Sequence, residues 1–320
     1  MTIPRFAAAL VWGSVLVLSA GGVGAQDFPN RLIRIVVASP GGGSDFMARR
    51  VAQGISGPLG VSVIVDYRGA GLLSAENVIK SPPDGYTLYV TGSTLWVVPL
   101  LRKVPYDVEK DFSPVTLTDQ SPGVLAVHPS LPVASVKELM VLAKSRPGEL
   151  TYSSSQAGGS GHLAGEAFKY MSGVNILWVP FKAAATSITS LVSGEVHLTI
   201  NDAVVIMPHV KGGRLKGLAV TTLQPSTLVP GLPTATASGL PGYEAVGRTG
   251  IWAPGKTPPD LIARLNQEIV RFLNRPEVKA SFLDAGTEVV SSTPEEFAAL
   301  IRSEMARTAK LIKAAGIKVD

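Results

Sequence analysis

The chain of 320 residues is 46% hydrophobic and 17% charged, a balance typical of folded globular proteins and not of disordered chains. Its 29 basic and 24 acidic residues leave a formal net charge of only +5. The densest basic group, Lys211, Arg214 and Lys216, lacks the interleaved aromatic residues of a nucleic-acid surface, so no nucleic-acid partner is expected. The absence of cysteine excludes disulfides, thiolate metal sites and a cysteine nucleophile.

The first 25 residues have the pattern of a secretory signal peptide. Arg5 precedes an apolar run from Phe6 to Ala20, and the small residues Val23 to Ala25 follow. The run is shorter than the ~20 residues that cross a bilayer as a helix. We therefore expect cleavage after Ala25 and a periplasmic location, with an uncleaved anchor as the alternative. Roughly 295 residues then remain, enough for two domains.

Strands are predicted where short runs rich in β-branched residues recur along the rest of the chain. Helical patterns lie between them, and the last of these, Pro294 to Ala315, has acidic residues in its first turn and Gly316 just beyond its end. Strands that alternate with helices predict an α/β fold with mostly parallel sheets. The expected strands are Leu32–Val37, Val61–Val65, Tyr86–Val90, Val124–Val127, Ile176–Val179, His197–Ile200, Leu218–Val220 and Ala245–Trp252. The other expected helices are one that contains Met47, one that contains Leu163, and the segments Val136–Ala143 and Leu261–Leu273.

Two loops share one design. Residues 37–45 join the first strand to a helix, and residues 153–162 join a later strand to another helix. Both are rich in Gly and Ser and lead into a helix N-terminus, where free backbone N–H groups and the helix dipole favour an anion. Ligands of α/β sheets bind at the carboxyl ends of strands, so the two loops predict a carboxylate site. Two alternatives stay open: Asp45 as a helix cap, and His162 as a histidine satisfied within its own helical turn.

An enzymatic function has little support in the sequence. Ser160 lies in Gly158-Gly159-Ser160-Gly161-His162, which departs from the G-x-S-x-G elbow of hydrolases, and no S-x-x-K occurs. The four histidines are far apart in the chain without metal-ligand spacing, and no phosphate-binding glycine motif is present. We expect a binding protein without a metal or cofactor, with a serine hydrolase built on Ser160 as the alternative.

A set of motifs in the same order resembles the Bug family, the extracytoplasmic receptors of tripartite tricarboxylate transporters. The resemblance runs over nearly all of the sequence after the signal peptide. Its motifs are Pro29–Arg31, Pro40–Asp45, Pro82–Leu88, Pro105–Asp107, Lys110–Phe112, His128–Pro132, Gly161–Glu166, Leu215–Thr221, Leu240–Tyr243 and Thr293–Phe297.

This resemblance implies a type II periplasmic-binding-protein fold, in which two Rossmann-like lobes are joined by two crossover strands. We place those strands near Val124–Val127 and Val246–Trp252. Lobe 1 would then contain residues 26–125 and 249–320, and lobe 2 residues 126–248. The resemblance further implies a ligand between the lobes, bound by Ser39, Gly42, Gly43, Asp45, Ser93, Thr94, Ser155, Ser160, His162, Asn201 and Asp202.

Departures from the family pattern leave the identity of the ligand open. An aromatic residue is replaced by Ala38, the usual Asp-Asn pair is reversed in Asn201-Asp202, the segment before Leu72 and Leu73 is shortened, and the usual Tyr-Lys-Gly becomes Phe181-Lys182-Ala183. The implied mechanism is hinge closure on a small organic anion, followed by docking of the monomeric receptor on the membrane subunits of the transporter. A sensory role, in which the bound solute is presented to a membrane histidine kinase, fits the same sequence.

Overall fold

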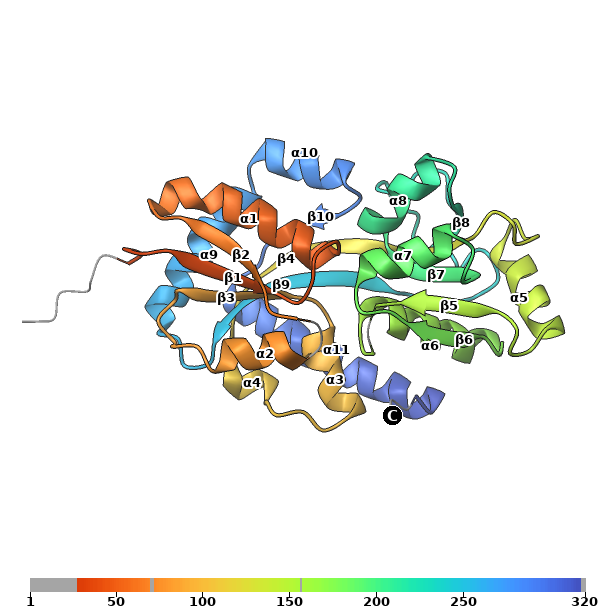
Figure 1. The fold of residues 1–320 in the computed structure, drawn as a ribbon, viewed down its shortest axis with the longest axis horizontal. Coiled ribbons are helices and arrows are strands. Elements are labelled where there is room, and N and C mark those ends of the chain that lie inside the picture. Colours follow the sequence, from red (N-terminus) through yellow and green to blue (C-terminus); the bar gives the residue numbers. More distant parts are fainter. Residues whose placement is uncertain (1–27, 70–71, 156, 318–320) are drawn as a thin grey trace, which may run out of the picture.

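The computed structural model describes residues 28–69, 72–155 and 157–317, so the predicted signal peptide lies outside the described residues. Two lobes lie side by side along the long axis (Figure 1). Within the described ranges, no helix combines the length and the apolar character needed to cross a membrane.

Lobe 1 is built on a sheet with the strand order β2-β1-β3-β9-β4, and the short β10 pairs with β4. The pairs β1–β2 and β1–β3 are parallel, whereas β9 runs antiparallel to both β3 and β4. The strands are β1 Ile33–Val37, β2 Val63–Tyr67, β3 Thr87–Thr91, β4 Phe112–Val127, β9 Val246–Pro254 and β10 Glu288–Val289.

Lobe 2 repeats this plan with the strand order β8-β4-β7-β5-β6. Here β5 is parallel to β6 and β7, and β4 is antiparallel to both of its neighbours. The additional strands are β5 Thr151–Ser154, β6 Leu177–Pro180, β7 Leu198–Asp202 and β8 Lys216–Val220. The sheets are therefore mixed, which corrects the expectation of mostly parallel sheets, because β9 runs against its neighbours β3 and β4 in lobe 1 and β4 runs against β7 and β8 in lobe 2.

Helices cover both faces of each sheet. In β4, Leu125 packs in one core with α5 and α6, and its neighbour Val124 packs on the opposite face with α7 and α8. This is the two-residue alternation of a strand that is buried on both sides. The helices are α1 Gly43–Leu59, α2 Leu72–Ile79, α3 Thr94–Leu101, α4 Val108–Asp111, α5 Val136–Ser145, α6 Ser160–Ser172, α7 Ala184–Val192, α8 Ala203–Lys211, α9 Pro259–Leu273, α10 Pro276–Asp284 and α11 Pro294–Ala315.

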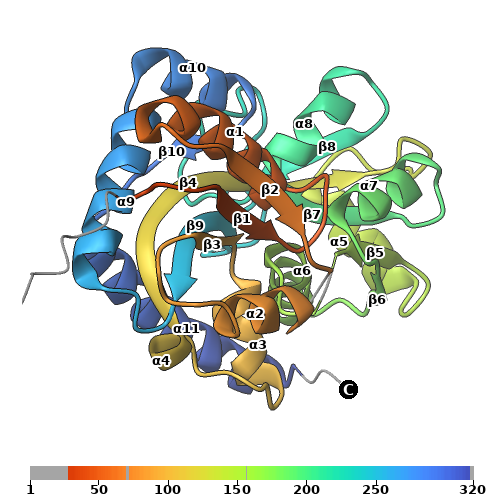
Figure 2. The same ribbon diagram turned by 60° about the vertical axis from the view of Figure 1, so that its left-hand side comes forward.

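The crossover strand β4 belongs to both sheets. It pairs with β9 up to Pro122 and with β7 and β8 from Gly123 onward. The chain returns to lobe 1 where β9 begins at Val246, opposite Pro122, and Figure 2 shows the strong curvature of β4 on this path. These features confirm two α/β lobes joined by two crossover strands. The expected lobe boundaries at residues 125 and 248 stay a prediction.

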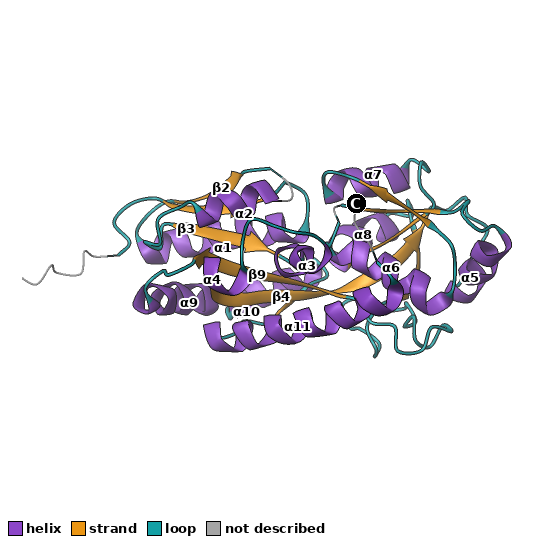
Figure 3. Ribbon diagram, turned by 90° about the horizontal axis from the view of Figure 1, so that it is seen from below, coloured by secondary structure: helices purple, strands orange, loops and turns teal. Residues whose placement is uncertain are grey.

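The last helix, α11, runs along both lobes (Figure 3). Its Phe297 and Ile301 pack in a core of lobe 1, and Leu311 packs against a core of lobe 2. A capping box formed by Thr293 and Glu296 begins the helix, and Gly316 ends it with a left-handed backbone, φ 62°. The sequence pattern predicted these helix limits, but not that the helix bridges the lobes.

The predicted strands and helices agree with the structure to within about two residues at most ends. The main strand that was missed is the first half of β4, Phe112 to Pro122, which has two prolines and several polar residues instead of a β-branched run. Pro114 lies at an irregular position of the pairing with β9, and Pro122 is the last residue of that pairing. Pairing between distant segments therefore decides this strand.

Candidate functional site

A cavity of about 120 Å³ lies between the lobes, at the carboxyl ends of β1, β3, β5 and β7. Such strand ends are the usual ligand position in α/β sheets. Ten of the residues expected at the site line this cavity: Ser39, Gly42, Gly43, Asp45, Ser93, Thr94, Ser155, Ser160, Asn201 and Asp202. That they contact a ligand stays a prediction.

Asp45 holds the glycine-rich loop in place. Its carboxylate accepts hydrogen bonds from the Gly41 N–H at 2.9 Å, from Arg49 Nε at 2.9 Å and from the Tyr67 hydroxyl at 2.6 Å. Gly41 has a φ of 84°, a left-handed backbone that glycine adopts without strain. Asp45 is buried, and its bonds fix the approach of the loop to the cavity.

His162 lies behind the second loop and does not line the cavity. Its Nδ1 accepts a hydrogen bond from the Gly158 N–H at 3.2 Å, and its ring packs on Trp178 with centroids 4.2 Å apart. Burial lowers the pKa of His162 to about 4, so the ring is neutral near pH 7. The His162 ring thus has its partners within the protein and supports the loop, which is the alternative that the sequence left open.

Two helix N-termini face the cavity from opposite lobes. α1 begins at Gly43 and α6 begins at Ser160, and both residues line the cavity. Neither helix has a side-chain cap, so its first backbone N–H groups and the positive end of its dipole are available to an anion. Hydroxyls of Ser93 and Ser155 supplement these amides on the cavity wall.

Asp202 brings an acidic group into the cavity wall. Burial first, and the charge of Asp119 second, raise the pKa of Asp202 to about 7. Burial likewise raises the pKa of Asp119 to about 6, against hydrogen bonds from Thr287 and Thr118 that lower it. Among the described residues, no side chain donates a hydrogen bond to the Asp202 carboxylate. Both protonation states of Asp202 are therefore populated near pH 7.

Two basic residues on the cavity wall were missed as site residues by the sequence analysis. Lys182 comes from the loop between β6 and α7, and Arg248 comes from the crossover strand β9. Arg248 also forms an ion pair with Glu304 of α11, with 3.2 Å between Nη1 and Oε1. The departure from the family pattern at Phe181 to Ala183 could have indicated Lys182 as a site residue. Nothing local marked Arg248, because β9 reaches the site only through the fold.

The lobes touch around the cavity. Ser93 Oγ of lobe 1 donates a hydrogen bond to the Gly158 carbonyl of lobe 2 at 3.4 Å. On the other side, a β-carbon placed on Gly41 would lie 2.9 Å from the Ala185 side chain of α7. The glycines therefore permit a close approach that any side chain would obstruct, and the structure shows a closed arrangement. In the described part of the chain, no group of His, Asp and Glu residues is placed to hold a metal ion.

Comparison with known proteins assigns the fold and the cleft to a family. Residues 47–317 match the family described as tripartite tricarboxylate transporter family receptor. The chain belongs to this receptor family. The receptor is 31% identical to Protein BugT of Bordetella pertussis over 306 residues, which cover 94% of both chains. The Bug resemblance is thereby confirmed, and the protein is a solute-binding receptor of this family.

Solved structures of similar receptors share the whole fold. R. palustris Rpa4515 with adipate is 35% identical, with a TM-score of 0.88 over 91% of this receptor and 99% of that chain. MatC from Rhodopseudomonas palustris with bound malate is 28% identical, with a TM-score of 0.84 over 89% of this receptor and 100% of that chain. The periplasmic binding protein BugD is 28% identical, with a TM-score of 0.86 over 91% and 99% of the two chains.

Proposed function

We propose that this receptor captures a small organic acid between its lobes in the periplasm and delivers it to the membrane subunits of a tripartite transporter. The observation that carries the proposal is the convergence of the α1 and α6 N-termini on one cavity from opposite lobes. A carboxylate placed between Gly43 and Ser160 accepts hydrogen bonds from both helices and meets both dipoles. Adipate and malate in two related structures support an organic acid as the ligand.

Closure of the lobes couples binding to delivery. The ligand contacts from lobe 1 and lobe 2 exist together only when the cleft is closed, so a ligand shifts the equilibrium toward the closed form by its differential affinity. The direct contacts between Ser93 and Gly158 belong to that form. The membrane subunits would recognise the closed arrangement, because it brings surfaces of both lobes into a fixed relation.

The first experiment is a thermal-shift assay of residues 26 to 320 with a panel of acids that includes adipate and malate. A ligand at 100 times its dissociation constant stabilises the folded protein by about 2.7 kcal/mol. The corresponding neutral amides are the controls, and we expect them to have no effect. Equal stabilisation by acid and amide, or no stabilisation by any acid, contradicts a carboxylate site.

Variants connect the assay to the site. Ser160→Ala removes a hydroxyl from the cavity wall at the start of α6, and Lys182→Ala removes a positive charge from it. We expect each to weaken acid binding about 10- to 150-fold, the loss of one hydrogen bond to a charged group. Ser303→Ala, on the exposed surface of α11, is the matched control and should bind like the wild type.

Delivery and export need separate measurements. Mass spectrometry of the exported protein should show that it begins at Gln26. Uptake of the identified acid should require both the receptor and the transporter membrane subunits in the same cells. A receptor that binds the acid but supports no uptake would contradict the delivery step alone.

A further inference from the structure

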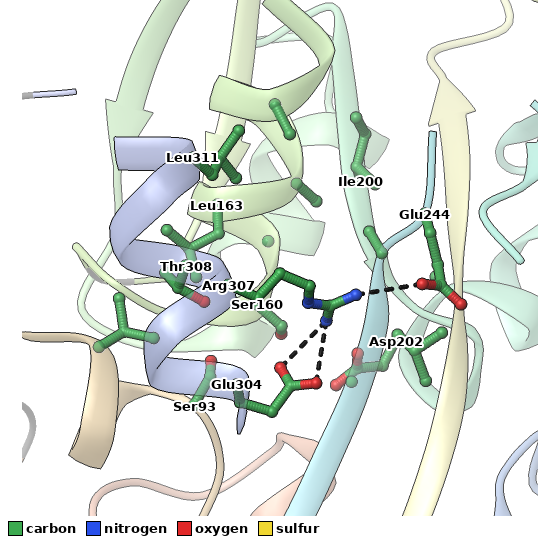
Figure 4. A pocket seen from close by; sticks show the side chains of 18 of the residues that line it. Ser93, Ser160, Leu163, Ile200, Asp202, Glu244, Glu304, Arg307, Thr308 and Leu311 are labelled. Atoms are coloured by element: carbon green, nitrogen blue, oxygen red, sulfur yellow. Dashed lines mark hydrogen bonds and ion pairs between the residues drawn. The ribbon is translucent and has the colours of Figure 1, made fainter. Parts of the chain in front are cut away.

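A second cavity, of about 270 Å³, adjoins the ligand cavity. Four residues line both cavities, Ser93, Ser160, Asn201 and Asp202. The remaining walls of the second cavity come from α3, α6, α11, the start of β9 with the loop before it, and single residues of β4 and β7, as Figure 4 shows in part. We call this second cavity the rear chamber. The shared wall places it directly beside the proposed carboxylate position at Ser160.

Apolar and polar side chains share the walls of the rear chamber, and the apolar ones contribute the larger part. They include Val97, Leu163, Ala164, Ala167, Met171 and Leu311. The two alanines of α6 leave space where larger side chains would fill it. At about 270 Å³, the chamber exceeds the ~150 Å³ apolar cavity that is known to hold a benzene molecule. A hydrocarbon chain or a ring of six carbons therefore fits.

The charged groups of the chamber already neutralise one another. Arg307 Nη2 binds Glu304 at 2.9 and 3.1 Å, and Arg307 Nη1 binds Glu244 at 3.1 Å. Glu304 also pairs with Arg248. Figure 4 shows the Arg307 side chain extending between the two glutamates. A second ligand carboxylate here would meet two glutamates and Asp202, and it would have to break these ion pairs to gain a cation.

We propose that the rear chamber is a subsite for the uncharged tail of the ligand. The receptor then selects monocarboxylates that carry an apolar chain or ring of about five or more carbons over dicarboxylates of the same length. This inference rests on the proposed function, since the carboxylate is held at the N-termini of α1 and α6. The tail passes between Ser93 and Ser160 and leaves water for the apolar walls.

The matched pair hexanoate and adipate tests the proposal by calorimetry. They have equal chain lengths, and only adipate carries a second carboxylate. We expect hexanoate to bind at least tenfold more tightly, and affinity to rise about fourfold per methylene from butyrate to hexanoate, as for other buried methylenes. Adipate binding as tightly as hexanoate would overturn the subsite and leave the proposed function intact. Absence of binding by every acid would instead overturn the proposed function.

Variants of the chamber provide the second test. Ala167→Leu fills it from α6, and we expect this variant to lose the gain from added methylenes. Tyr170→Leu, on the exposed side of α6, is the control and should keep the gain. Leu311→Ala enlarges the chamber and should shift the preferred chain length upward. An unchanged chain-length dependence in both Ala167→Leu and Leu311→Ala would contradict the subsite.

Discussion

The carboxylate of Asp202, at the end of β7, lies directly against the backbone of Gly247 near the start of β9. A β-carbon placed on Gly247 would overlap the Asp202 side chain. On its other side, the carboxylate faces Gly43 at the start of α1, where an added β-carbon would lie 3.5 Å from Oδ2. Asp202 therefore lies close both to a crossover strand and to the glycine-rich loop of the other lobe.

Gly247→Ala should destabilise the protein by about 1–3 kcal/mol, because the added methyl group displaces a packed side chain. It should also weaken ligand binding, since Asp202 lines the cavity. Thermal melts and calorimetry measure the two effects. Gly57→Ala is the control, because this helical glycine has open space around its β-carbon. That variant should gain about 0.5–1 kcal/mol, and a loss of stability there would contradict the packing argument.

Asp202 should make the stability of the ligand-free protein decrease as pH rises. Its pKa is about 7 in the folded protein and about 3.9 in an unfolded chain. The folded state therefore binds more protons between about pH 4 and 7, and the contribution of this group to stability is lost as pH rises through that window. Asp202→Asn removes the buried charge, so its melting temperature should exceed that of the wild type most at pH 8 and least near pH 4.

Only the comparison with the variant isolates Asp202. His162, whose pKa is lowered to about 4, acts in the opposite direction, since its contribution to stability is lost as pH falls from about 6.5 toward 4. The wild-type profile therefore contains both effects, together with that of Asp119, whose pKa is raised to about 6 by burial and which acts in the same direction as Asp202. Asp260→Asn removes an exposed carboxylate from the first turn of α9 and is the control. A difference between wild type and Asp202→Asn that is constant with pH would contradict the prediction.

Ala185→Leu should hold the lobes apart. Ala185 lies on the exposed side of α7, next to Gly41 of the opposite lobe. A leucine there obstructs closure, so ligand affinity should fall about tenfold or more while the melting temperature of the ligand-free protein stays within about 2 °C. Small-angle scattering should show a larger radius of gyration with ligand than for the wild type.

The control for closure is Thr189→Leu, one turn further along α7 and also exposed. It places a leucine on the same helix away from Gly41, and its affinity should match that of the wild type. Equal affinity of Ala185→Leu and Thr189→Leu would show that closure does not bring α7 against the glycine-rich loop.

His162→Phe should destabilise the second loop. Phenylalanine keeps a ring beside Trp178 but cannot accept the hydrogen bond from Gly158 N–H. A buried donor left without a partner costs about 1–3 kcal/mol. Hydrogen exchange at Gly158 should become faster, and acid binding should weaken because the loop forms the cavity wall. Gln at this position retains an acceptor and should recover part of both, whereas a direct ligand contact through the ring would not be recovered.

The fold class, the positions of most strands and ten of the residues that line the cavity could be predicted from local sequence patterns and the motif resemblance. Gly and Ser loops that lead into helices are local patterns, so residues 37–45 and 153–162 could be predicted to form an anion site without tertiary information. The limits of α11 were equally local, because its capping residues and terminal glycine are adjacent to its ends. The motif resemblance supplied Asn201 and Asp202.

Properties that depend on contacts between distant segments could be established only from the tertiary structure. The pKa of Asp202 is raised first by burial and second by Asp119 of another strand, and Arg248 reaches the cavity because β9 crosses between the lobes. The two roles open for His162 differ only in which way the ring faces, which a sequence does not encode locally. Apolar residues that line the rear chamber, such as Ala167 and Leu311, have the same periodicity as core residues. A pattern of hydrophobic side chains indicates that a face of a helix or strand is buried. Only the packing of the folded chain determines whether that face contacts a neighbouring element or lines a cavity.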